Sequence, residues 1–282
     1  MSNSLKTLDD VVYGLNDAKM QIMQIVGQWI SNPDAVGNAI AIKGPPGTGK
    51  TTLVKEGVSK ILNRPFVFIP LGGATDSSYL EGHSYTYEGS TWGRIVDALI
   101  TYKSMNPVFY FDELDKVSQT PKGEEIIGIL THLIDTTQNT QFHDKYFADI
   151  DFDLSKALFI FSYNDEKRIN RILLDRMYRI QTKGYESKEK IIIARKHLLP
   201  KIREQVNFEE DMVIIPDETL EFIITGVNHK LSETKYSYSQ ELTVGMSIHL
   251  ICNLLDLTTV YCLKRLFQNS NAFTKCFIYL HQ

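Results

Sequence analysis

One glycine-rich stretch constrains the fold of this chain more than any other feature. The sequence Gly-Pro-Pro-Gly-Thr-Gly-Lys-Thr at residues 44–51 fits the pattern GxxxxGK[ST]. It follows a short apolar run at 39–42 and precedes helical periodicity at 51–62. A phosphate-binding loop requires this strand–loop–helix context, because the phosphates sit at the N-terminus of the helix. We therefore expect a nucleoside triphosphate at this loop, and a plain glycine turn is the weaker interpretation.

Each position of the loop has a chemical role in this interpretation. The glycines let backbone N–H groups curl around the β-phosphate, while Lys50 reaches the β- and γ-phosphates. The Thr51 hydroxyl is placed to bind Mg²⁺. The candidate nucleotide-binding residues are Gly44, Pro45, Pro46, Gly47, Thr48, Gly49, Lys50, Thr51 and Thr52.

Short apolar runs alternate with helical periodicity up to residue 183. The runs have the composition of strands buried on both faces of a sheet, and they lie at 39–42, 65–71, 108–111, 157–161 and 177–181. Helical periodicity lies at 15–29, with Asn16 as the expected cap, and at 51–62, 91–102 and 124–134. This alternation predicts an α/β fold in which helices flank a parallel sheet.

The strand signals stop after residue 183, which predicts a domain boundary. Residues 187–197 have the pattern of a charged amphipathic helix. We expect a nucleotide-binding core at 1–183 and a smaller helical domain at 184–282.

Polar side chains follow three of the predicted strands. Asp112 and Glu113 end the run at 108–111, where a carboxylate can hold Mg²⁺ and its neighbour can polarise the attacking water, and we assign these roles in that order. Asn164 follows the run at 157–161 and is placed either to contact the γ-phosphate or water, or to cap a turn. Arg176 precedes the last run, where a lone arginine is usually a surface ion pair.

Charge and composition exclude several classes of protein. The chain has 30 Lys and Arg against 34 Asp and Glu, a net charge of -4, which argues against binding nucleic acid through bulk positive charge. No apolar run reaches the roughly 18 residues of a membrane span. The N-terminus lacks the pattern of a secretory signal, and the spacing of the three cysteines fits no zinc site. We expect an intracellular, cytoplasmic protein, in the host cytoplasm if the chain is viral.

Several further stretches carry a family resemblance. They include Leu-Gly-Gly-Ala-Thr-Asp at 71–76, Asp-Glu-Leu-Asp-Lys at 112–116, Leu-Leu-Asp-Arg-Met at 173–177 and Arg-Lys-His-Leu-Leu-Pro-Lys at 195–201. Together with Tyr-Gly-Leu at 13–15 and the loop at 44–51, they resemble the AAA+ ATPase module of Lon proteases, over roughly residues 8–225. The stretch at 70–93 is also similar to the Lon-like ATPases of large DNA viruses.

The resemblance implies ATP and Mg²⁺ as cofactors, a helical lid after the core, and a ring, expected to be a hexamer. It implies that Arg176 is an arginine finger entering the neighbouring subunit's site and that Asn164 is the first sensor. Tyr13 and Gly14 fall on the segment that lines the adenine pocket. Tyr87 falls on the aromatic residue of the pore loop that grips unfolded polypeptide, although Glu88 follows it where Lon has an aliphatic residue.

Two departures from Lon bear on function. The sequence contains no proteolytic domain with a Ser-Lys dyad, so we expect no protease activity in this chain, and a separate protease is a candidate partner. No counterpart of the lid segment that carries the second-sensor arginine follows residue 226. The charge-poor end at 228–282, which holds all three cysteines, is interpreted as a divergent lid, a partner-binding segment or a truncated or shifted reading frame.

These features favour a Mg²⁺-dependent ATPase that forms a ring and remodels or threads misassembled or unfolded protein clients. A nucleotide-responsive scaffold with little hydrolysis is the second hypothesis, favoured by the missing arginine and by Glu88. A DNA-handling loader-type ATPase is the third, and the net charge does not support it.

Overall fold

The computed structural model of this chain describes residues 2–32, 39–74 and 76–200, with seven isolated positions between 204 and 224. The chain divides into two compact units, residues 1–44 with 49–183, and residues 45–48 with 184–282. We describe each unit by itself. The expected divergence of the lid from residue 228 lies outside the described residues.

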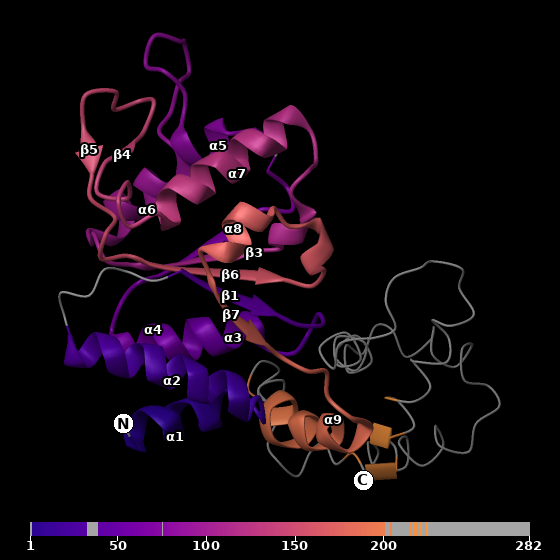
Figure 1. Cartoon of the computed structure of the whole chain (residues 1–282). Coiled ribbons are helices and arrows are strands. Elements are labelled where there is room, and N and C mark those ends of the chain that lie inside the picture. The colour runs from indigo at the N-terminus through magenta and orange to yellow at the C-terminus, as the bar shows by residue number, and fades with distance from the viewer. Residues whose placement is uncertain are drawn as a thin grey trace. The chain divides into compact units, whose positions relative to one another are not determined.

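A five-stranded parallel sheet forms the centre of the first unit (Figure 1). Its strand order is β2-β3-β6-β1-β7. The strands are β1 (Ala39–Lys43), β2 (Phe66–Pro70), β3 (Val108–Asp112), β6 (Leu158–Tyr163) and β7 (Tyr178–Gln181). All six residues of β6 and the first four of β3 are buried, which explains why these strands read as continuous apolar runs rather than alternating ones. The predicted α/β fold with a parallel sheet is confirmed.

Alternate residues of the central strands pack on opposite faces of the sheet. On one face Phe109 stacks on Phe159 and Phe111 stacks on Phe161, with ring centroids 5.7 and 4.9 Å apart. These rings pack in one core with α5 (Ser78–Glu81), α6 (Arg94–Tyr102), α7 (Pro121–Ile134) and α8 (Arg171–Asp175). Figure 1 shows these helices on the same side of the sheet.

The other face of the sheet is covered by the N-terminal helices and by the helix after the glycine-rich loop (Figure 1). These are α1 (Ser2–Val11), α2 (Asn16–Ser31), α3 (Lys50–Thr52), a π-helical stretch at Leu53–Val58, and α4 (Ser59–Leu62). Asn16 is the first residue of α2, and Leu15, with φ 53°, occupies the capping position. The cap predicted at Asn16 is therefore wrong by one residue.

A short hairpin separates α7 from β6. It consists of β4 (Phe142–His143) and β5 (Asp151–Phe152), which pair antiparallel outside the main sheet. Two 3-10 turns, Leu114–Lys116 and Glu166–Arg168, follow β3 and β6.

The second unit begins with helix α9 (Ser187–Ile193), which continues as a π-helical stretch at Ala194–Leu198. Glu186 and Glu189 form a capping box at its start. The carboxylate of each residue accepts a hydrogen bond from the backbone N–H of the other. Arg195 pairs with Asp217. Among the described residues of the chain, no helix is long and apolar enough to span a bilayer.

Candidate active site

The glycine-rich loop leads directly from β1 into α3. Gly47 and Gly49 have φ of 74° and 86°, a left-handed conformation that side-chain-bearing residues rarely adopt. Gly44 donates its N–H to the Tyr163 carbonyl at 3.1 Å. A Cβ on Gly44 would lie 1.8 Å from Thr182 Oγ1, so only glycine fits there. The sequence thus needs glycine at these positions for backbone geometry and for close packing.

Lys50 brings the loop into contact with the end of a second strand. The side chain is buried, with 8% of the residue exposed. Its Nζ donates to the Gly44 carbonyl at 2.7 Å and to Asn164 Oδ1 at 3.2 Å. The structure therefore brings together the predicted phosphate-binding lysine and the amide predicted at the end of β6.

Thr51 and Asp112 are connected through a buried tyrosine. Thr51 Oγ1 donates to Tyr110 Oη at 3.2 Å, and Ser162 Oγ donates to Asp112 Oδ1. Burial raises the pKa of Tyr110 to about 12, although its contacts with Ser162 and Thr51 act in the opposite direction, so the hydroxyl keeps its proton at neutral pH. Tyr110 and Ser162 were not among the residues predicted from the sequence. The sequence does offer one sign of them. Each carries a hydroxyl two residues before a predicted site residue, Tyr110 before Asp112 and Ser162 before Asn164.

The predicted pair of metal ligands suits Mg²⁺. Thr51 offers a hydroxyl and Asp112 a carboxylate, and Mg²⁺ prefers oxygen ligands of this kind, completed by phosphate and water oxygens. Hydrogen bonds through Tyr110 and Ser162 connect the Thr51 hydroxyl to the Asp112 carboxylate. The donor set therefore fits the expected cofactor.

Glu113 follows Asp112 in a left-handed conformation with φ 58°. Its N–H donates to Asp112 Oδ1 at 3.2 Å and to Ser162 Oγ at 3.3 Å. Its carboxylate lies over Gly72, because a Cβ there would be 2.3 Å from Glu113 Oε2. The metal-binding and water-orienting residues of the prediction thus share one hydrogen-bonded corner.

Asp115 is a further buried carboxylate beside this corner. The residue is 5% exposed, and its Oδ2 accepts the Asp165 N–H at 3.2 Å. This bond joins the turn after β3 to the residue that follows Asn164. Asp115 is not predicted as a site residue from the sequence, although it lies two residues after Glu113.

The turn that contains Tyr13 and Gly14 joins α1 to α2. Gly14 has a φ of 63°. Val12, two residues before Gly14, has a methyl group 3.3 Å from where a Gly49 Cβ would lie. The turn is thereby close to the end of the glycine-rich loop. The adenine-pocket role of Tyr13 stays a prediction.

Arg176 lies at the end of α8 and binds α7. Its Nη1 donates to Asp135 Oδ2 at 2.7 Å and to the Thr131 carbonyl at 3.4 Å. Hydrogen bonds from Thr137, and then the Arg176 charge, hold the pKa of Asp135 below its ordinary value. The structure thus places this guanidinium at the C-terminal end of α7, and its role as a finger toward another subunit stays a prediction.

Tyr87 and Glu88 lie in a loop that projects beside α5 in Figure 1. Tyr87 is 69% exposed. The base of the loop is closed by the His83 N–H, which donates to the Thr91 carbonyl at 3.1 Å, and by the Gly93 N–H, which donates to buried Asp144 at 2.8 Å. The loop therefore has a fixed stem and an exposed aromatic tip, and its contact with polypeptide stays a prediction.

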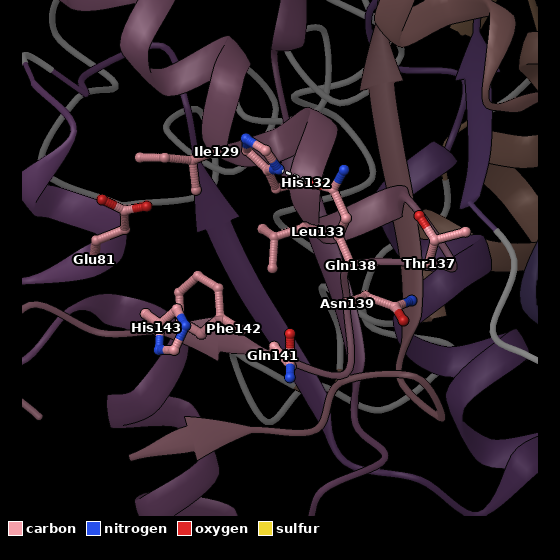
Figure 2. Close-up of a pocket in the computed structure, with 10 residues that line it drawn as sticks. All are labelled: Glu81, Ile129, His132, Leu133, Thr137, Gln138, Asn139, Gln141, Phe142 and His143. Atoms are coloured by element: carbon pink, nitrogen blue, oxygen red, sulfur yellow. Dashed lines mark hydrogen bonds between the residues drawn. The ribbon is translucent and has the colours of Figure 1, made fainter. Parts of the chain in front are cut away.

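Figure 2 shows a cavity of about 330 Å³ between α5, the C-terminal half of α7 and β4. His132 Nδ1 and Gln138 Oε1 are hydrogen-bonded at its rim. None of the nucleotide-binding or catalytic residues predicted from the sequence lines this cavity. It is separate from the corner formed by the loop and the strand ends.

Comparison with known proteins identifies an ATPase family, which agrees with the predicted nucleotide-binding residues of the site. The family model for the "ATPase family associated with various cellular activities (AAA)" matches residues 40–185. The Lon protease homolog of Acanthamoeba polyphaga mimivirus is 40% identical over 225 residues, which are 79% of this chain and 22% of that protein. The Lon protease of Clostridioides difficile is 42% identical over 238 residues, 84% of this chain and 29% of that protein.

A plant relative has similar coverage. The peroxisomal Lon protease homolog 2 of Zea mays is 38% identical over 219 residues, 78% of this chain and 24% of that protein. The chain thus spans between a fifth and a third of the length of these relatives. The resemblance to Lon proteases is confirmed, and because the family model covers more than half of the chain, this protein belongs to the AAA family of ATPases.

Proposed function

We propose that this chain hydrolyses ATP in a Mg²⁺-dependent reaction, at sites completed by neighbouring copies in a ring, and uses the energy to remodel or thread protein clients. One observation carries the catalytic part. Lys50 of the loop contacts Asn164 at the end of β6, and Thr51 reaches Asp112 at the end of β3 through Tyr110. Polar groups at the carboxyl ends of parallel strands are where α/β sheets bind ligands.

The residues of this corner have separate tasks in hydrolysis. The acceptors of the Lys50 ammonium include two neutral groups, the Gly44 carbonyl and the Asn164 amide, and an anionic phosphate is a stronger acceptor than either. Glu113 orients the attacking water and takes its proton. Thr51 and Asp112 would hold Mg²⁺, which would neutralise charge on the β- and γ-phosphates.

The ring part of the proposal concerns Arg176. In a single subunit its guanidinium is 40% exposed and paired with Asp135. An arginine supplied in trans stabilises charge on the transferring phosphoryl group, so this side chain would exchange Asp135 for the γ-phosphate of the neighbouring site. Support comes from the AAA family match and from the similarity to Lon proteases. We infer a closed homo-oligomer, with six subunits as the expected number.

The client part concerns the loop at 83–93. Its exposed Tyr87 is suited to grip an unfolded polypeptide, and Glu88 beside it would favour segments that carry positive charge.

We assign ATP hydrolysis, and not peptide hydrolysis, to this chain, and client cleavage would require a separate protease. Casein degradation by the chain alone would contradict that assignment. The cytoplasmic location expected from the sequence remains a prediction.

Steady-state ATP hydrolysis by wild type and by Glu113→Gln tests the catalytic part. We expect the variant to bind ATP as wild type does but to turn over about a hundredfold more slowly, because a positioned base contributes at least that factor. Glu124→Gln, an exposed glutamate of α7, is the matched control and should hydrolyse at the wild-type rate. Wild-type binding of ATP with no turnover above Glu113→Gln would favour the scaffold hypothesis.

Mixing two inactive variants tests the ring. Arg176→Ala keeps its own Glu113, and Glu113→Gln keeps its own Arg176, so a mixed ring contains some interfaces with both groups intact. We expect the mixture to recover part of the activity that each variant lacks alone, and the activity of wild type to rise cooperatively with protein concentration. A mixture as inactive as its components would argue against sites shared between subunits.

A further inference from the structure

The hydroxyl of Tyr110 lies between the two residues that the proposed function assigns to the metal. Tyr110 is fully buried in β3, and its ring packs against Phe66 and Phe68 with centroids 5.9 and 6.1 Å away. The ring is therefore fixed, and so is the position of its Oη. Its strand neighbours, residues 108, 109 and 111, carry no polar side-chain atom.

The contacts of this hydroxyl reach both metal ligands. Thr51 Oγ1 donates to Tyr110 Oη at 3.2 Å. The same Oη interacts with the Asp112 carboxylate and with the Ser162 hydroxyl. Ser162 in turn donates to Asp112 and accepts the Glu113 N–H at 3.3 Å. A buried hydroxyl needs partners to offset its lost hydration, and within the described part of the chain the partners of Tyr110 Oη are residues of the site.

The direction of the hydrogen bond from Thr51 matters for metal binding. A threonine hydroxyl has one proton and two lone pairs. A lone pair can face a cation only when the proton points to another acceptor. Tyr110 Oη is such an acceptor, and its own proton is then directed to the Asp112 carboxylate. A phenylalanine in this place would leave the Thr51 hydroxyl free to rotate.

We propose that Tyr110 is a positioning residue for the Mg²⁺ site, which directs the lone pair of Thr51 and ties Thr51 to Asp112. The inference rests on the proposed function, because it concerns the same metal. It predicts that the metal affinity of the nucleotide complex depends on the Tyr110 hydroxyl, while the affinity for nucleotide without metal does not. A purely structural role for Tyr110 would affect both affinities alike.

Metal binding by the full chain tests this directly. Mn²⁺ serves as the probe, and bound Mn²⁺ is measured by electron paramagnetic resonance with a saturating non-hydrolysable ATP analogue. Affinity for the analogue alone is measured in EDTA. We expect Tyr110→Phe to weaken Mn²⁺ binding roughly three- to tenfold, the equivalent of one hydrogen bond, and to change binding in EDTA by less than about twofold.

Tyr163→Phe is the matched control. Tyr163 is also buried in the sheet, on the neighbouring strand β6, but its hydroxyl has no hydrogen-bond partner among the described residues. Its replacement should leave Mn²⁺ affinity unchanged. Should Tyr110→Phe fail to fold, Ser162→Ala carries the test, because Asp112 then loses a donor and Mn²⁺ binding should weaken in the same way.

Two results would overturn the inference. One is a Tyr110→Phe protein that binds Mn²⁺ as tightly as wild type, and the other is equal weakening with and without the metal. Failure of the nucleotide-binding part of the proposed function would look different, since the wild-type chain would then bind neither the analogue nor Mn²⁺ with it.

Discussion

One residue at the end of β3 has a backbone conformation that its type disfavours. Glu113 has φ 58°, a region that costs a non-glycine residue about 1–3 kcal/mol. Hydrogen bonds from its N–H to Asp112 and Ser162 hold it there. Such strain is typical of functional sites, because the surrounding contacts fix a side chain in a direction that a relaxed backbone would not give.

The space above Gly72 makes this direction possible, and it leads to a prediction. A methyl group in Gly72→Ala would lie 2.3 Å from Glu113 Oε2, so the carboxylate would have to move. We expect kcat for ATP hydrolysis to fall about tenfold, because small displacements of a catalytic group are costly, while nucleotide affinity stays nearly constant. Steady-state kinetics and equilibrium nucleotide binding measure the two effects.

The adjacent glycine provides the control. A Cβ on Gly73 would meet no atom within 4 Å, so Gly73→Ala should hydrolyse ATP at the wild-type rate. Equal losses in both variants would indicate a change in the whole loop rather than a displaced Glu113.

At the scale of elements, the strands were predictable and several connecting pieces were not. The runs at 108–111 and 157–161 are continuous because both faces of β3 and β6 are buried, and that pattern is visible in a sequence. Neither α1 nor the β4–β5 hairpin is predicted from the sequence. Polar residues fill much of α1, and strands of two residues have no measurable period.

The candidate site shows the same division. Lys50, Thr51, Asp112 and Glu113 could be predicted because their spacing along one chain follows a motif. Tyr110, Ser162 and Asp115 could not, because their importance depends on contacts across neighbouring strands, and each reads as an ordinary strand or turn residue in the sequence.

The junction of α1 and α2 depends on one buried lysine. Lys19 is 2% exposed, and its Nζ donates to the Val12 carbonyl at 2.6 Å and to Asp9 at 2.8 Å. Lys19→Met keeps an unbranched side chain, shorter by one atom, but leaves the carbonyl without this donor. We expect the free energy of unfolding to fall by about 1–3 kcal/mol. Urea unfolding followed by circular dichroism measures it.

The same variant should also affect the nucleotide, since Val12 lies against Gly49. We expect ATP binding several-fold weaker than wild type at a temperature where both proteins are folded. Lys6→Met, on the exposed side of α1, is the control and should change stability by less than about 0.5 kcal/mol. A Lys19→Met protein as stable as this control would contradict the assigned role of the buried ammonium.

At the scale of the whole molecule, carboxylates with lowered pKa couple the stability of the fold to pH. Hydrogen bonds lower the pKa of Asp76, Asp135 and Asp153, and the hydrogen bond from Lys43 is the main cause for Glu166. The native state therefore keeps these groups ionised to a lower pH than the unfolded state does. As the pH falls through about 4, the unfolded chain takes up protons first, and the free energy of unfolding decreases.

Glu166 tests this coupling because it joins two strands. Its carboxylate accepts from Lys43 at the end of β1, at 2.8 Å, and from Arg179 of β7, at 3.2 Å. Glu166→Gln should be less stable than wild type at pH 7 by less than about 1 kcal/mol, since the pairs are partly exposed. The difference should shrink as the pH falls from 7 toward 3, because protonation of the wild-type carboxyl removes the charge that Lys43 and Arg179 pair with.

Urea unfolding at pH 7, 5 and 3 measures that difference. The sign follows from the lowered pKa of Glu166, whose contribution exists above the ordinary pKa of a glutamate and is lost as the pH falls below it. Glu124→Gln removes an exposed carboxylate outside these pairs and controls for the change in net charge. A stability difference between Glu166→Gln and wild type that stays constant from pH 7 to pH 3 would mean that the ion pairs of Glu166 contribute nothing to the fold.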